Sequence, residues 1–295
     1  MKFPIEYNEP LFRPPSEALS LIFQITIGCS WNKCSFCEMY TSKKFTVKKE
    51  EDVIKEIIDY SNIDPDVRKV FLADGNVMVL SSSRLIRILT QLNESFPHLR
   101  RISAYAMPQD IIQKSKEELK ELYESGLKLL YIGIESGDDE LLNLINKGET
   151  FSTTVESINK AQEAGIQTSV MIINGLGGKK YSRQHSINSA RVVNEIQPHY
   201  LSTLVLSYPL GLEHYKSRAG YDFEPLNKKE LFEELKLFIE NTNLTSTIFR
   251  SDHASNYLTL KGILSRDKEI LVERLSLAIN SPGKLYLRPE WARGL

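Results

Sequence analysis

The stretch Thr26-Ile-Gly-Cys-Ser-Trp-Asn-Lys-Cys-Ser-Phe-Cys-Glu-Met-Tyr40 decides how this chain is interpreted. It holds all three cysteines of the 295 residues, Cys29, Cys34 and Cys37, in a C-x4-C-x2-C spacing. Three thiolates on one short loop can bind three irons of a four-iron, four-sulfur cluster and leave the fourth iron open to a small molecule. The spacing therefore predicts a [4Fe-4S] cluster that serves chemistry.

Other uses of the cysteines fit the pattern less well. A structural zinc site takes four ligands, usually from two pairs, whereas this chain has one Cys-x2-Cys pair and five scattered histidines. A disulfide framework uses an even number of cysteines and is typical of small secreted chains. Zinc and inert thiols remain the alternatives to an iron–sulfur cluster.

Composition narrows the class of protein. Hydrophobic residues make up 41% of the chain and charged residues 25%, as in a globular protein with a sizeable core. The net charge of −1 gives no field for non-specific nucleic-acid binding. The first residues lack the apolar core of a signal peptide, and no run approaches the roughly 20 apolar residues of a membrane span. We expect a cytoplasmic protein with no membrane partner and no clear nucleic-acid surface.

Strand and helix patterns alternate along most of the chain. Short apolar runs rich in β-branched residues are separated by stretches with helical periodicity, and they lie at 21–27, 70–73, 101–106, 129–134, 167–173 and 200–207. Six such units in series predict a parallel sheet with right-handed crossovers. Because eight units would close a barrel, we expect an α/β fold that is a partial, open six-stranded (β/α)6 barrel of the TIM type.

The pattern of predicted strands and helices changes after this series. Helical patterns cover 227–241 and 266–280, with a short strand pattern at 247–250 between them. We therefore expect an N-terminal arm (1–19), a barrel (20–215) and a small, mainly helical C-terminal extension (216–295) that packs on the barrel. The cysteine loop follows the first strand, so it should lie at the rim where barrel enzymes place their active sites.

These features resemble the radical S-adenosylmethionine (radical SAM) superfamily, whose common motif is C-x3-C-x-aromatic-C after the first barrel strand. Phe36 is the aromatic residue before Cys37, and one extra residue separates Cys29 from Cys34. The run Ile132-Gly-Ile-Glu-Ser-Gly137 is similar to the group of anaerobic coproporphyrinogen oxidases and methylthiotransferases. The resemblance covers about residues 20–215.

The resemblance implies two cofactors, a [4Fe-4S] cluster and S-adenosylmethionine. In this family one electron from the cluster cleaves S-adenosylmethionine reductively to a 5′-deoxyadenosyl radical, which abstracts hydrogen from a substrate. The cofactors supply the hard chemistry, and the protein supplies position and exclusion of solvent. An external one-electron reductant of the flavodoxin or ferredoxin type is implied, with an unknown small-molecule substrate and an oxidoreductase or transferase reaction.

The same resemblance, taken position by position, predicts residues that contact the cofactors. Cys29, Cys34 and Cys37 are the metal ligands. The residues expected at S-adenosylmethionine follow the predicted strands or the cysteine loop, and they are Phe36, Asp74, Gly75, Ser103, Glu135, Asn174, Gly175 and Leu206.

Each of these positions also has a structural interpretation. Asp74 and Gly75 replace the family's paired glycines and glutamate, and Asp-Gly is common in tight turns. Glu135 could serve the start of the next helix, and Ser103 could be a satisfied core hydroxyl. Gly175 could serve only its turn.

Candidates for catalysis are fewer. Tyr105 is two residues from Ser103 on the third predicted strand, so both point to the same side of the sheet. Asp252 and His253, with Asn256, form a polar cluster in the C-terminal extension, where a histidine could move a proton near neutral pH. The alternative for this cluster is a capped turn.

Two other functions compete with a small-molecule radical enzyme. A non-catalytic iron–sulfur electron carrier would need neither a barrel nor an open iron. A radical SAM enzyme that modifies RNA usually adds a basic face, which the balanced charge does not favour.

Overall fold

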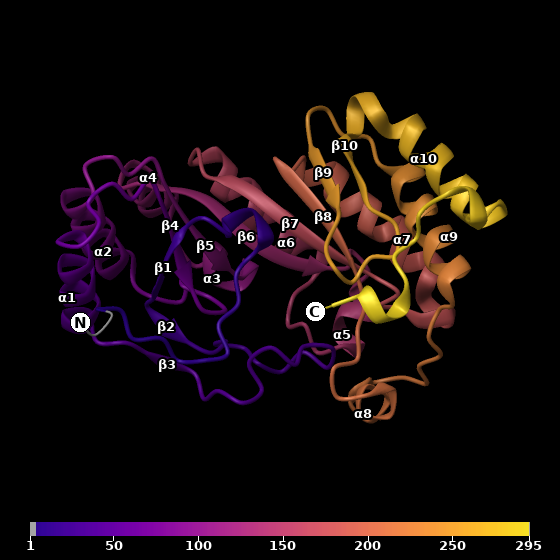
Figure 1. Ribbon diagram of the computed structural model, residues 1–295, viewed down its shortest axis with the longest axis horizontal. Helices are drawn as coiled ribbons and strands as arrows, with labels where there is room; N and C mark the ends of the chain where they lie inside the picture. Colours follow the sequence, from indigo (N-terminus) through magenta and orange to yellow (C-terminus); the bar gives the residue numbers. More distant parts are fainter. Residues whose placement is uncertain (1–3, 295) are drawn as a thin grey trace. The chain divides into compact units, whose positions relative to one another are not determined.

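The computed structural model describes residues 4–294 and is shown in Figure 1. The chain folds into two compact units. Unit 1 comprises the residues up to Asn32, Met39–Ile132 and Glu156–Thr168. Unit 2 comprises Lys33–Glu38, Gly133–Val155 and the residues from Ser169 on. Among the described residues, no helix is both long and apolar enough to cross a membrane.

The main sheet has eight strands in the order β1-β4-β5-β6-β7-β8-β9-β10. They are β1 (Leu21–Gln24), β4 (Lys69–Ala73), β5 (Arg101–Ala106), β6 (Leu127–Glu135), β7 (Gln167–Asn174), β8 (Tyr200–Val205), β9 (Ile248–Ser251) and β10 (Leu260–Ile263). The sheet is mostly parallel, β10 runs antiparallel to β9, and the sheet is not closed. The prediction of an open α/β fold is confirmed, and the sheet is two strands larger than the predicted six.

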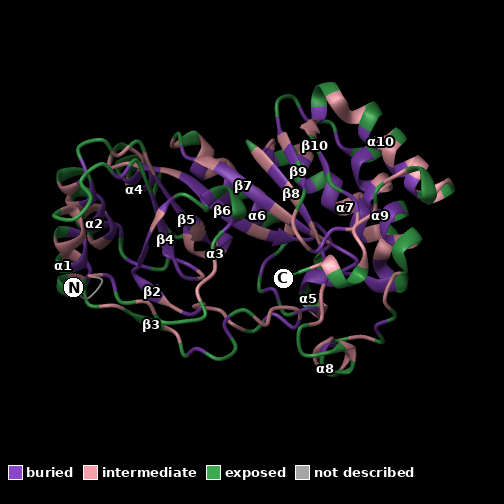
Figure 2. Ribbon diagram, viewed as in Figure 1, coloured by how far each residue is buried: buried purple, intermediate pink, exposed green. Residues whose placement is uncertain are grey.

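Unit 1 buries its strands under helices, which are α1 (Glu50–Ser61), α2 (Ser82–Ser95), α3 (Pro108–Ile112), α4 (Lys116–Glu124) and, from Glu156 on, α6 (Phe151–Glu163). In Figure 1, α2 lies beside α1 and α4, and it packs against both. The apolar stripe of α2, which includes Leu85, Ile88 and Leu92, is buried. Figure 2 shows that the strands are buried, whereas the outer faces of the helices are exposed.

Unit 2 carries the remaining helices, which are α5 (Asp139–Leu144), α7 (Gly178–Ile196), α8 (Leu212–Arg218), α9 (Lys228–Asn241) and α10 (Leu264–Asn280). Helix α9 packs against both α7 and α10. Its start is fixed by a capping box, in which Asn227 Oδ1 accepts from Glu230 N and Glu230 Oε2 accepts from Asn227 N. The C-terminal helices are therefore confirmed, at nearly their predicted bounds.

Two local pairings differ from the expectation. The predicted strand 21–27 ends as β1 at Gln24, because Thr26 and Ile27 form β2 (Thr26–Ile27) and pair instead with β3 (Thr46–Val47) in a separate two-stranded sheet. The extension is mainly helical and carries the predicted strand as β9, but it also contains a strand that was not predicted, β10, which pairs with β9 and continues the main sheet. Both differences come from pairing with distant segments, which hydrophobic periodicity does not reveal.

Candidate functional site

The first part of the cysteine loop belongs to unit 1 and packs on the turn after β4. Gly75 N donates to Gly28 O at 3.2 Å. A Cβ added at Gly75 would lie 2.9 Å from Cys29 Cβ, closer than real Cβ atoms approach, and 3.1 Å from Tyr40 Cε2, a tight contact. Gly75 is therefore required for the close approach of the Cys29 loop. Its predicted cofactor contact stays a prediction.

Asp74 is the centre of a buried network at this turn. Its Oδ2 accepts from Gly28 N at 2.9 Å, from Gln24 Nε2 at 3.0 Å and from Lys43 Nζ at 2.8 Å. The Lys43 and Asp74 side chains are 3% and 0% exposed. Among the described residues, the buried Oδ1 atom has no hydrogen-bond partner. Asp74 thus does more than form a tight turn: it holds the loop that leads to Cys29.

Asn76, the next residue but one, makes a second clamp that sequence analysis missed. Its Nδ2 donates to Ser30 Oγ at 3.0 Å and to Asp110 Oδ2 at 2.5 Å. Burial raises the pKa of Asp110, and the hydrogen bond from Asn76 partly opposes that shift. Asn76 thereby joins the residue after Cys29 to α3. What marks Asn76 for this role is the full burial of its amide side chain after a strand, and that burial is seen in the structure and not in the sequence.

The two candidates on β5 lie inside packed surroundings. Ser103 is fully buried, and its Oγ donates to Val70 O at 3.3 Å. The ring of Tyr105 makes edge contacts with Phe71 and Tyr131, at centroid distances of 5.0 and 6.2 Å. Burial raises the pKa of Tyr105, so its hydroxyl is a neutral group at physiological pH. The Ser103 contact favours the satisfied core hydroxyl, and both functional roles remain predictions.

The second part of the cysteine loop belongs to unit 2. Cys34 is buried and Cys37 is partly exposed, and Cys37 N donates to Cys34 O at 3.3 Å. Arg218 of α8 donates to Cys34 O at 2.9 Å and pairs with Glu38 Oε1 at 2.5 Å. Phe36 packs against the apolar core around α5. Arg218, which sequence analysis did not single out, thus fixes both ends of this segment.

Glu135 ends β6 and forms a buried ion pair with Lys147, at 3.4 Å from Oε1 to Nζ. Burial raises the pKa of Glu135, and Lys147 opposes the shift. Burial also opposes the charge of Lys147, but Glu135, then Cys34, then Glu149 outweigh it and the pKa of Lys147 is raised. Lys147 therefore keeps a positive charge near Cys34.

The alternative role of Glu135, support of the following helix, is filled by another residue. Asp138 is the N-cap of α5, with its Oδ1 accepting from Leu141 N at 2.8 Å. Glu135 itself has a φ of +63°, in the left-handed region. A Cβ at Gly133 would lie 2.0 Å from Glu135 Oε1. The sequence around Glu135 therefore leaves space for its carboxylate without using it as a cap.

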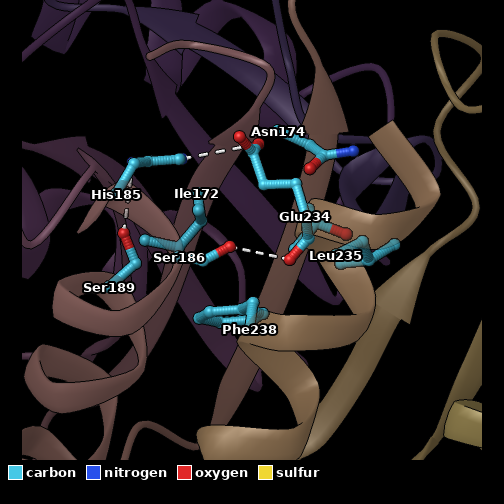
Figure 3. Close-up of a pocket in the computed structure, with 9 residues that line it drawn as sticks. Ile172, Asn174, His185, Ser186, Ser189, Glu234, Leu235 and Phe238 are labelled. Carbon is cyan, nitrogen blue, oxygen red and sulfur yellow. Dashed lines mark hydrogen bonds and ion pairs between the residues drawn. The ribbon is translucent and has the colours of Figure 1, made fainter. Parts of the chain in front are cut away.

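The turn after β7 is held by α9. Asn174 Nδ2 donates to Leu231 O at 3.1 Å, and Gly175 N donates to Glu234 Oε1 at 2.5 Å. Leu206 N donates to Asn174 O at 2.9 Å, so the ends of β7 and β8 meet here. Figure 3 shows Glu234 reaching from α9 toward Asn174 and His185. The predicted residues Asn174, Gly175 and Leu206 are thus brought together.

His185 completes this arrangement from α7. Its Nε2 lies 3.0 Å from Ile173 O and its Nδ1 lies 2.8 Å from Ser136 Oγ. Because a carbonyl only accepts, Nε2 carries the hydrogen and Nδ1 accepts from the serine. Burial lowers the pKa of His185 to about 4 and raises the pKa of Glu234 to about 7. The neutral His185 side chain therefore connects β7 to the turn after β6 through two hydrogen bonds.

The predicted cluster in the extension forms a compact turn. His253 Nδ1 accepts from Ser255 N at 3.1 Å, and Asn256 Nδ2 donates to Thr203 O at 2.8 Å. Burial, followed by nearby Arg288, lowers the pKa of His253, whereas Asp252 opposes the shift. These contacts favour the capped turn, and the catalytic roles of Asp252 and His253 stay untested predictions.

The metal ligands also remain predictions. Within the described part of the chain, Cys29, Cys34 and Cys37 form no disulfide. Over residues 4–294 no three His, Cys, Asp or Glu side chains already stand together as a metal site. The fit to a cluster therefore depends on the donor set and on the surroundings of each cysteine.

Comparison with known proteins adds three relatives. The chain is 26% identical to "Heme chaperone HemW" of Bacillus subtilis (strain 168) over 164 residues, covering 55% of this chain and 42% of the relative. It is 30% identical to "tRNA-2-methylthio-N(6)-dimethylallyladenosine synthase" of Hahella chejuensis (strain KCTC 2396) over 173 residues, covering 54% and 36%. The chain thus spans less than half the length of these two relatives.

A solved structure and a family model agree with them. Coproporphyrinogen III oxidase (HemN) from Escherichia coli matches with a TM-score of 0.57 at 18% identity, over 75% of this chain and 51% of that one. The model of the radical SAM superfamily matches residues 23–189. Enzymes of that family use a [4Fe-4S] cluster and S-adenosylmethionine, and they need a reductant and a substrate. On the matched residues and the shared open α/β fold, this chain belongs to the radical SAM superfamily.

Proposed function

We propose that this chain is a radical SAM enzyme in which Cys29, Cys34 and Cys37 hold the [4Fe-4S] cluster. Reductive cleavage of S-adenosylmethionine to a 5′-deoxyadenosyl radical then starts hydrogen abstraction from a small-molecule substrate. Membership of the superfamily supports radical chemistry with this cofactor. The observation that carries the residue assignment is the buried Glu135–Lys147 pair, with the Lys147 charge near Cys34.

The residues around the cysteines fit a cluster. Cys34 is buried where the Lys147 ammonium favours a thiolate, the form in which cysteine binds metal. Gly75 leaves the space that Cys29 occupies, so no side chain crowds that thiol from the β4 turn. When bound, the cluster supplies the electron that splits the sulfonium of S-adenosylmethionine.

The remaining polar groups would bind and orient the cofactor. Lys147 offers donors for the methionine carboxylate, and Glu135 offers oxygens for the ribose hydroxyls. The unpaired Oδ1 of Asp74 would accept from the methionine ammonium, which favours a carboxylate. The backbone around Gly175 and Leu206 would lie against the adenine. All of these roles follow from charge and hydrogen-bonding capacity.

The decisive experiment is anaerobic reconstitution with iron and sulfide. We expect close to one four-iron cluster per chain, and slow formation of 5′-deoxyadenosine and methionine after reduction. The triple variant with Cys29, Cys34 and Cys37 changed to alanine should lose the visible iron–sulfur absorbance. If the cluster forms but S-adenosylmethionine neither binds nor is cleaved, the chain is an electron carrier instead.

RNA modification is a second candidate, because the Hahella relative is named as a tRNA-modifying synthase. The two functions differ in what stimulates cofactor cleavage. Faster 5′-deoxyadenosine formation with unfractionated tRNA, but not with small metabolites, would favour RNA as substrate. We propose a flavodoxin- or ferredoxin-type reductant and a cytoplasmic setting, since cysteines that form no disulfide among the described residues suit a reducing compartment.

A further inference from the structure

Unit 2 contains a pocket of about 520 Å³ whose polar side chains were not among the candidates of the sequence analysis. It opens at the ends of β7 and β8, where Gly175, Leu206 and Tyr208 contribute to its wall. Pro225, Leu226 and Leu231 add apolar surface, while Ser255, Tyr257, Glu290 and Arg293 add polar groups. The volume lies within the roughly 300–1,000 Å³ of small-molecule sites. An apolar wall with a few convergent polar groups is typical of such sites.

The polar groups form a subsite that already binds one carboxylate, that of Glu290. Glu290 lies with one carboxylate oxygen against Arg293 Nη1, and its other oxygen accepts from Tyr257 Oη at 2.7 Å. Arg293 is fixed in turn, because its Nε donates to Ser255 O at 2.8 Å. The guanidinium also stacks on the Tyr257 ring, with 3.9 Å between Cζ and the ring centroid. One carboxylate is therefore recognised by a guanidinium and a phenol together.

The carboxylate that fills this subsite is easily replaced. The Glu290 side chain is 71% exposed, whereas that of Arg293 is 13% exposed. An exposed carboxylate gains little from an ion pair, because water and salt screen it. Lys228 lies over the Tyr257 ring, 4.7 Å from its centroid, and adds positive charge to the same place. An incoming anion would thus meet two cations and only one solvent-exposed competitor.

The segment that carries Glu290 is anchored independently of that contact. Arg288 Nη1 donates to His253 O at 2.8 Å, Ala254 O at 2.9 Å and Asn256 O at 2.7 Å. Arg288 N donates to Tyr257 O at 2.7 Å. The segment that carries Glu290 therefore stays in place when the Glu290 carboxylate moves away from Arg293.

We propose that this pocket binds the substrate, an amphipathic carboxylate whose anionic end replaces Glu290 at Arg293 and Tyr257. Its apolar body would lie on Leu206, Leu226 and Leu231. This inference rests on the proposed function, since it names the substrate class of that enzyme. Glu290 then acts as an internal competitor that keeps the subsite filled between substrates.

The test compares two fluorescent probes of equal size, 1-naphthaleneacetate and its neutral amide, on the reconstituted full-length chain. We expect the carboxylate to bind about tenfold more tightly than the amide, as loss of one charge-assisted pair predicts. Glu290→Gln should tighten carboxylate binding several-fold, because it removes the competitor. Arg293→Gln should abolish the preference for the carboxylate. Glu213→Gln is the matched control: it removes an exposed carboxylate from another i,i+3 ion pair, with Lys216, and should change nothing.

Three results would overturn the proposal. They are equal binding of both probes, unchanged binding in Glu290→Gln, and a carboxylate preference that survives in Arg293→Gln. Competitive displacement of the probe by S-adenosylhomocysteine would assign the pocket to the cofactor instead and would also refute it. Cleavage of S-adenosylmethionine is measured separately on the same preparation. Loss of the probe preference with intact cleavage refutes only this inference, and absent cleavage refutes the proposed function.

Discussion

Two buried carboxyl groups, one in each unit, hold a turn that follows a strand, and they do so in different ways. In unit 1, Asp74 holds the loop before Cys29 and is paired with the buried ammonium of Lys43. In unit 2, Glu234 holds the turn at Gly175 and faces the neutral ring of His185, 3.9 Å away. The two carboxyl groups have different surroundings: the Lys43 ammonium contacts Asp74, whereas burial raises the pKa of Glu234 to about 7.

The turn at Gly175 therefore does not require an ionised carboxylate, whereas the contact at the cysteine loop is an ion pair. The buried ion pair of Lys43 and Asp74 at the cysteine loop is stable only while both partners are present. A protonated carboxyl can still accept from a backbone N–H through its carbonyl oxygen. The predictions below test this difference and the roles proposed for neighbouring groups.

The largest effect is expected from breaking the pair in unit 1. Lys43→Met leaves Asp74 as a buried charge without its cation, so the free energy of unfolding should fall by about 3–5 kcal/mol. Denaturant unfolding of the cluster-free chain measures it. Lys55→Met removes an exposed partner of Asp59 and serves as the control, with an expected change below about 1 kcal/mol. Equal losses in the two variants would contradict the buried clamp.

Glu234→Gln should reveal the opposite behaviour in unit 2. Between pH 4.5 and about 7 the carboxyl ionises in the unfolded chain but keeps its proton in the folded one. The contribution of Glu234 to the stability of the parent therefore falls as pH rises through this window, and the variant lacks that fall. The variant should gain relative to the parent by at most about 3 kcal/mol from pH 4.5 to 8, from about 1.4 kcal/mol per pKa unit.

Unfolding curves across that pH range test the prediction. Neighbouring Glu233 is the control, since its carboxylate is half exposed and pairs with Lys229. The buried His185 adds an opposite trend, because its pKa is lowered to about 4 and stability is lost as pH falls below 6.5. That trend cancels when variant and parent are compared at each pH. A gain that does not vary with pH would show that Glu234 is ionised in the folded chain.

Glu135→Gln separates cofactor binding from structure. The change keeps the shape but replaces an acceptor oxygen with a donor, so affinity for S-adenosylmethionine should fall about ten- to a hundredfold, or about 1.5–3 kcal/mol. Cluster content should stay close to the parent's, whereas the free energy of unfolding should fall, because Lys147 loses its buried partner. Glu140→Gln, at an exposed position on α5, is the control. Unchanged affinity in a destabilised protein would falsify the cofactor role.

The smallest effect is expected at Ser103. Its hydroxyl donates to Val70 O inside the sheet, so Ser103→Ala should cost about 1 kcal/mol of unfolding free energy. Affinity for S-adenosylmethionine should not change, as equilibrium binding to the folded variant would show. A tenfold weaker affinity would instead support the cofactor contact that the sequence pattern suggested.

Much of the fold was predictable because its signals are local. The runs at β4 through β8 and the periodicity of α2 and α9 lie within a few turns of chain, and all of them form where expected. What failed was pairing between segments: Thr26 and Ile27 join β3, and β10 extends the sheet. The candidate site divides in the same way. Glu135 and Asn174 end strands and Leu206 follows one, so the sequence pattern named them as candidates, whereas Lys43, Lys147 and Arg218 follow no motif and were missed.

The sequence by itself determined the cysteine spacing, the aromatic residue before Cys37 and the alternation of strands and helices, and these are enough to identify the superfamily. They are determined locally, because spacing along the chain limits which groups one loop can present. Only the tertiary structure decided the partners: Lys43 reaches Asp74 across 31 residues, Glu234 reaches Gly175 across 59, and Arg293 meets Tyr257 across 36. Such meetings depend on how distant segments pack, and packing also sets the burial that moves each pKa.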